Sequence, residues 1–348
     1  MPEQHRIVYT NIVDTMRRML VVGMVAMFAV MGYYVWQYNT VKPSAITPAP
    51  VKTVSDADVI VHGVELVEYV HERTLWNLWA DEASIYSATK KTYLQDVVAD
   101  FFDTAGVRSL HLISDSGEKD DLSGDITASG NVEADAIAEG AHLKTDELRY
   151  NAETQLVTSE THVLLTRDNV ITEGEGLESD VHLSNVRILR DVNTTLALPD
   201  PLAPPVTITA DALQLDNGTR IATYTGHVVV VQEETEIRAD LMRVFLVTTG
   251  SGENSADSIE RIKVFGNVHV SQMEMMATGE KGEYTAATQV VVLTGTPEKQ
   301  AYAEDRAANR SMLADLIRVY LETNDFEGDG NVNFSGLSSD LPILAPEP

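Results

Sequence analysis

Short segments in which apolar and polar residues alternate return along most of this chain. The clearest are "SGNVEAD" from Ser129, "FGNVHVS" from Phe265 and "DGNVNFS" from Asp329, and "TGHVVVV" from Thr225 is a fourth copy. In the first three, every second residue after the glycine is apolar, which predicts a β-strand with one buried face. Short runs of Val, Ile, Thr and Tyr broken by Gly, Asn and Asp fill the chain after residue 40, so we expect an all-β protein.

A second phrase precedes three of these copies: "TADALQLDN", "RADLMRVFL" and "LADLIRVYL". The spacing from Asp211 to Gly226 equals that from Asp315 to Gly330, and the spacing from Asp240 is longer because "TTGSGENSADS" interrupts it. We interpret the pair of phrases as a strand, turn, strand unit with an insertion in one hairpin loop. Repeated units of roughly 20 to 45 residues cannot bury their apolar faces alone, so the pattern predicts a stacked array of such units.

The N-terminal segment predicts a membrane anchor. Residues 19–36 carry no charge, and as a helix they would extend about 27 Å, close to the thickness of one hydrocarbon core. Arg17 and Arg18 precede this run and an aromatic belt closes it. The positive-inside rule therefore puts the N-terminus in the cytoplasm and the remainder outside. The alternative is a cleaved secretory signal.

Composition changes along the chain indicate six segments. We expect a cytoplasmic stub and single transmembrane helix at 1–38, a Pro-rich stalk at 39–54, a first β domain at 55–198, a Pro-rich linker at 199–205, a second β domain at 206–336 and a tail at 337–348. Proline cannot donate to a central sheet ladder, which is why the proline cluster is interpreted as a linker.

Charge and motif content exclude several functions. The chain has 53 acidic and 25 basic residues and a formal net charge of -28, with the acids scattered, so nucleic acid is a poor partner. There is no cysteine, and the sequence contains none of the common hydrolase, phosphate-loop or dinucleotide motifs. The histidines lack metal-ligand spacing. We therefore expect no enzyme activity, no metal and no cofactor.

The apolar strand faces have two possible interpretations, which differ in what covers them. Another sheet could cover them and form an ordinary sandwich core. Alternatively they could line a groove that holds alkyl chains, because each buried methylene contributes about 0.8 kcal/mol without any polar recognition.

Residues 206–336, with "ITADALQLDN", "TGHVVVV", "FGNVHVS" and "LADLIRVYL", resemble the LptA, or OstA-like, family of lipopolysaccharide transport proteins. The first half, with its N-terminal anchor, "LWADEASIYSATKKTYLQDVVADFF" and "LKTDELRYNAETQLVTSETHVLLT", resembles the LptC family. Together they suggest an LptC and LptA fusion, whereas family members are usually two separate polypeptides. The resemblance implies two tandem open, twisted β-jellyroll domains whose interior holds the acyl chains of lipid A.

The resemblance also implies partners and a location. Terminal edge strands of such domains pair by β-augmentation, so that the grooves join into a bridge between the two membranes. The implied partners are lipopolysaccharide, the inner-membrane LptB, LptF and LptG transporter, and the N-terminal domain of outer-membrane LptD or further LptA copies. The bulk of the chain would lie in the periplasm. The alternative is a structural adaptor that links envelope proteins without binding lipid.

Under the transport reading no residue is catalytic, and the site is a lining of apolar side chains. In the second half the expected lining residues are Ile208, Ala210, Val228, Val230, Ile237, Val268, Val270, Tyr284, Val291, Leu293, Val332 and Phe334. In the first half they are Leu78, Ala80, Ile85, Tyr86, Val132, Leu143, Leu148 and Tyr150. Each of these residues could instead be an ordinary packing residue, because a β-bulge reverses the face that a strand presents.

Overall fold

The computed structural model describes residues 57–70, 72–198, 204–249, 256–320, 323 and 325–336. The predicted anchor, the stalk, most of the linker and the tail lie outside these residues. Among the residues that the structure does describe, no helix is long and apolar enough to cross a membrane.

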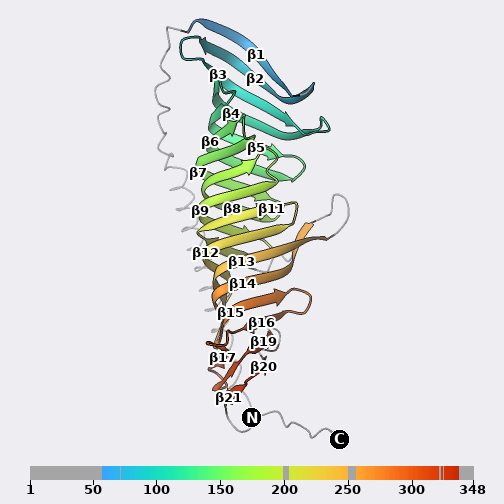
Figure 1. Cartoon of the computed structure of the whole chain (residues 1–348), viewed down its shortest axis with the longest axis vertical. Coiled ribbons are helices and arrows are strands. Elements are labelled where there is room, and N and C mark those ends of the chain that lie inside the picture. Colours follow the sequence, from blue (N-terminus) through green and yellow to red (C-terminus); the bar gives the residue numbers. More distant parts are fainter. Residues whose placement is uncertain are drawn as a thin grey trace, which may run out of the picture. The chain divides into compact units, whose positions relative to one another are not determined.

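Every regular element within the described residues is a strand, so the predicted all-β class is confirmed. The first half contributes β1 (Val59–Val70), β2 (Arg73–Tyr86), β3 (Lys91–Phe102), β4 (Arg108–Asp120), β5 (Ile126–Ala136), β6 (Ala141–Asn151), β7 (Leu156–Arg167), β8 (Val170–Asp180) and β9 (Asn185–Leu196). Each of these strands pairs antiparallel with the next one along the chain. The strands therefore stack in sequence order, as Figure 1 shows.

The second half continues the same ladder. Its strands are β10 (Val206–Ala210), β11 (Ala212–Asp216), β12 (Ile221–Gln232), β13 (Thr235–Thr249), β14 (Ala256–Gln272), β15 (Met275–Thr285), β16 (Val290–Thr294), β17 (Ala301–Asp305), β18 (Arg310–Ala314), β19 (Leu316–Tyr320), β20 (Asp325–Asp329) and β21 (Asn333–Ser335). Strand β9 pairs with both β10 and β11, which are two arms of one strand divided at Asp211. The edge-strand pairing that the family resemblance implies is thus present between the two halves.

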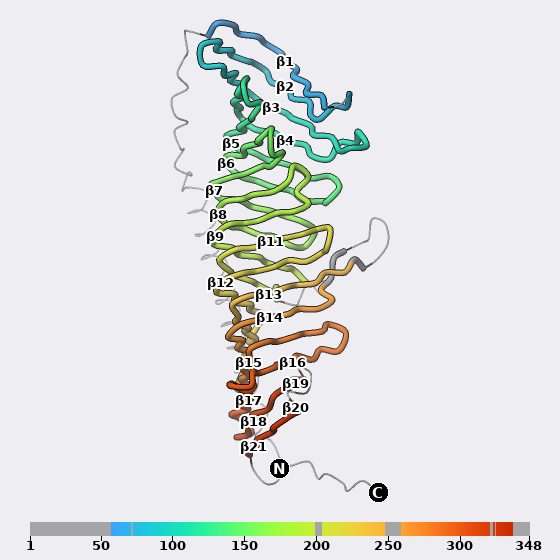
Figure 2. The backbone as a smooth tube through the Cα atoms, in the orientation of Figure 1, coloured from blue at the N-terminus to red at the C-terminus, as the bar shows by residue number. Residues whose placement is uncertain are grey.

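The hairpin formed by β13 and β14 is longer than its neighbours. Their pairing extends from Thr235 and Gln272 to Thr249 and Ala256, and the tube in Figure 2 shows the two strands lying between β12 and β15. The insertion that the sequence places between Asp240 and Gly266 lies in this hairpin, as predicted.

A bend recurs where the repeated sequence phrases meet. At Gly130, Gly226, Gly266 and Gly330, φ is between 71° and 80°, and the following Asn or His also has a positive φ. An aspartate on the preceding strand faces each of these glycines: Asn131 Nδ2 donates to Asp115 Oδ2 at 2.7 Å, Asn267 to Asp240 at 2.8 Å and Asn331 to Asp315 at 2.7 Å. In the fourth copy His227 Nδ1 lies 2.9 Å from Asp211 Oδ2. We call each such set of Asp, Gly and Asn or His a corner.

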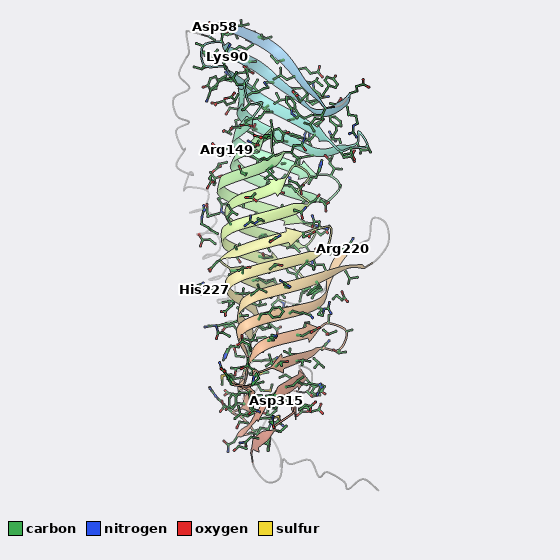
Figure 3. The ribbon with its side chains drawn as sticks, viewed as in Figure 1. Asp58, Lys90, Arg149, Arg220, His227 and Asp315 are labelled. Carbon is green, nitrogen blue, oxygen red and sulfur yellow. The ribbon has the colours of Figure 1, made fainter. Side chains whose placement is uncertain are left out.

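The corners explain why the two phrases recur together. Ladder registers shift at the corners of Gly130, Gly226 and Gly266, for example between Phe265 and Val268, so these three corners are β-bulges that bend their strands. The fourth corner, at Gly330, lies between β20 and β21. In Figure 3, His227 lies at one edge of the strands, whereas Arg220, in the turn before β12, lies at the other. The bend lets both arms of one strand face the same interior.

Three hydrogen bonds of Asn217 tie the halves together beside the ladder. Asn217, which follows β11, accepts a hydrogen bond from Arg167 Nη1 of β7 at 2.7 Å and donates to the Leu183 carbonyl at 3.1 Å. The backbone N–H of Asn217 donates to the Ser184 carbonyl at 2.9 Å. Asn217 therefore anchors the second half to two segments of the first.

Replacing Gly266 with alanine is expected to lower the free energy of unfolding by about 1–3 kcal/mol, because φ stays positive and the new Cβ crowds Asp240. An added Cβ would lie 2.3 Å from Asp240 Oδ2. Denaturant unfolding followed by circular dichroism measures the change. Gly140→Ala is the matched control, since Gly140 has a φ of 61° but open space at its Cβ position. An equal loss in both variants would show that the carboxylate contact contributes nothing.

Asn217→Ala is expected to destabilise the joint by about 1–3 kcal/mol, because the partly buried Arg167 guanidinium loses an acceptor. Thermal unfolding of the full chain provides the measurement. Asn193→Ala is the control: Asn193 is exposed on β9 of the same joint, and its side chain makes no hydrogen bond within the described residues. If the two variants melt at the same temperature, the Asn217 contacts do not hold the halves together.

Candidate functional site

One row of directly opposed residues crosses the sheet from β1 to β21. We call it the long row, and its members, each paired with the next across neighbouring strands, are Leu66, Leu78, Ala99, Leu112, Ala134, Leu143, Leu165, Thr172, Thr194, Ile208, Val230, Ile237, Val270, Ala277, Ala303, Met312 and Phe334. Apart from the two threonines, this row is apolar. It passes from the first half into the second at Thr194 and Ile208 without a break.

A second row runs along the other arms of the bent strands. Its members are Tyr150, Val157, Ser179, Val186, Leu215, Ala222, Val244, Ile262, Tyr284, Val291, Val319 and Phe326. The members of both rows belong to the hydrophobic cluster of the molecule or border it, apart from the half-buried Phe334 at the end of the ladder and three polar members, Thr172, Thr194 and Ser179. The two rows therefore enclose one interior shared by both halves.

The structure brings most of the predicted lining residues into this interior. Leu78, Leu143, Ile208, Val230, Ile237, Val270 and Phe334 belong to the long row, and Tyr150, Tyr284 and Val291 belong to the second row. Side chains two positions apart on a strand share a face. Of the predicted residues that lie two positions from a row member, Val332 alone is exposed, and the buried ones are Ala80, Val132, Leu148, Ala210, Val228, Val268 and Leu293.

Three predicted residues are neither row members nor buried neighbours of one. Val332 is 48% exposed, because it precedes the short β21 at the end of the ladder, where no further strand covers it. Ile85 and Tyr86 are adjacent on β2 and therefore point to opposite faces. Ile85 shares the phase of the buried Ala83, whereas the Tyr86 ring packs edge-on against Tyr93 at 5.5 Å.

The interior of the first half contains a small cavity of about 30 Å³. Leu78, Leu148 and Tyr150 contribute to its wall together with residues of β3, β4, β5 and β7. The rings of Phe101 and Tyr150 meet there at an angle, with 5.6 Å between centroids. Side chains of the two arms otherwise pack closely at this level.

A larger cavity of about 240 Å³ lies where the halves join. Leu165, Thr172, Thr194 and Ile208 line it from the long row, and Val186, Leu215, Ala222 and Val244 line it from the second row. Leu246 and Ile259, from the long hairpin of β13 and β14, complete part of its wall. Strands of both halves thus build this larger cavity together.

The polar side chains of the interior are mostly hydroxyls. Among the described residues, the buried polar side chains are Thr92, Ser109, Ser114, Thr145, Ser159, Thr172, Ser179, Thr194 and Asp305. Asp305 pairs with Arg310 at 3.1 Å near a turn. Burial raises the pKa of Tyr224, which also lines the larger cavity, to about 12, so this phenol stays neutral at physiological pH.

Charged side chains gather on the outer face of the strands. Lys144 lies 2.7 Å from Glu133 on the neighbouring strand, and the hydrogen bond that it donates lowers the pKa of that carboxyl. His111 Nδ1 lies 2.7 Å from Asp100. Within the part of the chain that the structure describes, no three potential ligands converge as a metal site would require. The interior is lined mostly by apolar side chains and hydroxyls, which suit apolar contact.

The sequence patterns did not predict most of the larger cavity between the halves, which we call the junction cavity. Of its lining residues, only Ile208 was predicted. The alternation of Val186, Ile188 and Val192 in β9 could have identified one buried face. Thr172 and Thr194 occupy apolar positions of the pattern but are polar residues, so a hydropathy pattern cannot find them.

Comparisons with known proteins agree with this architecture. Residues 24–197 match the family described as lipopolysaccharide-assembly, LptC-related, and residues 207–325 match the family described as LptA/(LptD N-terminal domain) LPS transport protein. An uncharacterized protein of Rhizobium meliloti (strain 1021) is 36% identical over 92 residues, which are 26% of this chain and 50% of that protein. The chain thus spans about half the length of this curated relative.

Among solved structures, the chain is similar to LptH, the LptA homologous periplasmic component of the lipopolysaccharide transport device of Pseudomonas aeruginosa. The two are 17% identical with a TM-score of 0.31, over 38% of this chain and 94% of that one. The first family match spans half of the chain and the second covers most of its remainder. This chain therefore belongs to the LptC-related family of lipopolysaccharide-assembly proteins, with an LptA-like domain fused to its LptC-like half.

Proposed function

We propose that this chain is a membrane-anchored bridge protein that binds lipopolysaccharide and passes it from the inner-membrane ABC transporter towards the outer membrane. The observation that supports this proposal is the long row, which continues from β1 to β21 across the joint between the halves. Acyl chains gain about 0.8 kcal/mol for each methylene that leaves water, and they need no polar groups for recognition. An apolar path through both halves suits such a cargo.

The free edges of the ladder suit docking at both ends. Among the described strands, β1 pairs with β2 alone, and Val59, Ile60 and Tyr69 on it are exposed. An exposed strand edge with apolar side chains invites a further strand. In this proposal β1 pairs with the LptB, LptF and LptG transporter. The edge at β20 and β21 receives the LptD N-terminal domain or a further LptA copy.

The close packing of the interior favours a second candidate, a structural adaptor without lipid cargo. Leu78, Val268 and Leu293 are at most 1% exposed, and the molecule's own side chains cover them. In this alternative the rows form a filled core, and the chain only spaces envelope proteins apart. Lipid binding decides between the two candidates.

A photo-crosslinking residue at Ile237 is expected to capture lipopolysaccharide in cells, because Ile237 belongs to the long row. The matched control is Arg238, the next residue on β13, which is exposed and points to the opposite face. Immunoblotting for lipopolysaccharide adducts of the full chain measures capture. Capture at Arg238 but not at Ile237 would contradict transport through the interior.

Delipidated full-length protein is expected to bind fluorescent lipid A saturably, and Val270→Asp is expected to weaken this binding at least tenfold because it places a carboxylate in the apolar row. Val231→Asp is the control, since Val231 is 40% exposed. Fluorescence titration, with circular dichroism to verify folding, gives the affinities. Absence of saturable binding by the unsubstituted protein would support the adaptor instead.

A further inference from the structure

The junction cavity contains a polar break in the long row. Thr172 of β8 and Thr194 of β9 oppose each other there, flanked by Leu165 on one side and Ile208 on the other. Both threonines are buried, at 4% and 2% exposure, and both line the cavity. A packing role alone would be met by valine, which has the same shape and no hydroxyl to satisfy.

These threonines form a chain of hydroxyl groups with Tyr224 of β12. The Tyr224 hydroxyl donates to Thr194 Oγ1 at 3.2 Å, and Thr194 Oγ1 lies 3.1 Å from Thr172 Oγ1. Because Tyr224 stays protonated, the three hydroxyl groups carry three hydrogens, and only two of these hydrogens are used in the two hydrogen bonds. None of these hydroxyls has a further hydrogen-bond partner within the described residues. One hydrogen is therefore left to donate, in a place where an unmade hydrogen bond is costly.

Of the other polar residues of the cavity wall, Asp168 is exposed, whereas Arg167 and Asn169 bond to other parts of the protein. Arg167 donates to Asn217, and the Asn169 side chain donates to the Ala197 carbonyl. The hydroxyl chain of Thr172, Thr194 and Tyr224 is thus a part of the wall that can donate a hydrogen bond to a bound molecule. The cavity, at about 240 Å³, exceeds the roughly 150 Å³ that suffices for benzene in an apolar protein cavity.

We propose that the junction cavity binds an acyl chain that carries an oxygen acceptor, a hydroxyl or an ester carbonyl, and that this oxygen accepts the spare hydrogen of the hydroxyl chain. The proposal rests on the proposed function and deepens it. The apolar wall holds the methylenes, and the hydroxyl chain distinguishes an oxygen-substituted acyl chain from a plain one. The site would hold such a lipid at one fixed position along the interior, where the two halves join.

The test uses two photoreactive twelve-carbon fatty acids that differ only in a 3-hydroxyl group. Each carries a diazirine and is incubated with the full chain in detergent micelles, and labelled peptides are identified by mass spectrometry. We expect peptides of β8, β9 and β12 to take the hydroxylated probe about fivefold more than the plain one, as one neutral hydrogen bond would give. Labelling of peptides around the small first-half cavity normalises for partitioning into micelles.

A triple variant, Thr172→Val with Thr194→Val and Tyr224→Phe, removes all three hydroxyls at nearly constant shape. Replacing every partner of a buried hydrogen-bonded set by apolar groups leaves stability nearly unchanged. We expect the variant to label equally with both probes, with the plain probe unaffected. The matched control is Thr145→Val with Ser159→Ala, which removes two other buried, hydrogen-bonded hydroxyls away from the cavity and should keep the preference.

A separate variant, Ile208→Phe, fills the cavity and should reduce labelling of its peptides by both probes, even if the triple variant folds poorly. Equal labelling by the two probes in the unsubstituted protein would overturn the proposal, as would a preference that survives in the folded triple variant. Labelling elsewhere in the interior but not at the cavity would refute this site and leave the transport proposal standing. Failure to capture lipopolysaccharide at Ile237 would contradict the transport proposal but not the proposal for the cavity. The preference between the two fatty acids is measured independently of that capture.

Discussion

The register of the antiparallel ladder is the constraint on which the rest of this structure depends. Side chains alternate between faces along each strand, so a slip of one residue would turn every side chain of the slipped strand to the opposite face. The pairing of Ile208 with Thr194 on one side and Val230 on the other keeps the long row in phase across the joint. The shared interior exists because this phase is held from β1 to β21.

The corners keep that register while the strands bend. At each corner the glycine takes a conformation that other residues resist, and the aspartate leaves no room for a Cβ. Between β6 and β7 a different set serves the same purpose, since Thr145 Oγ1 contacts Ser159, Thr161 and the His162 carbonyl where the register shifts. A local polar cluster, which need not be Asp, Gly and Asn, therefore directs both arms of a strand to one interior.

Sequence patterns predicted the parts of this structure that depend on one strand at a time. The alternation around Val132, Val268 and Val270 correctly identified buried faces, because burial at a period of two leaves a direct trace. The paired Asp and Gly phrases were recognised as a repeat, but their mutual contact could not be read from spacing. The junction cavity was missed because it needs two halves in register and includes two threonines. Val332 follows the same pattern as Val268, yet it is exposed because no strand follows β21 in the described ladder.

The division of one strand into β10 and β11, both bonded to β9, has a consequence for how many copies of each half are present. The contact itself is a ladder of backbone hydrogen bonds, and the peptide link between the halves supplies a high effective concentration for forming it. A fused chain therefore fixes the stoichiometry of the first contact at one LptA-like unit for each LptC-like unit. Two separate polypeptides with the same edges would make that ratio depend on their relative synthesis.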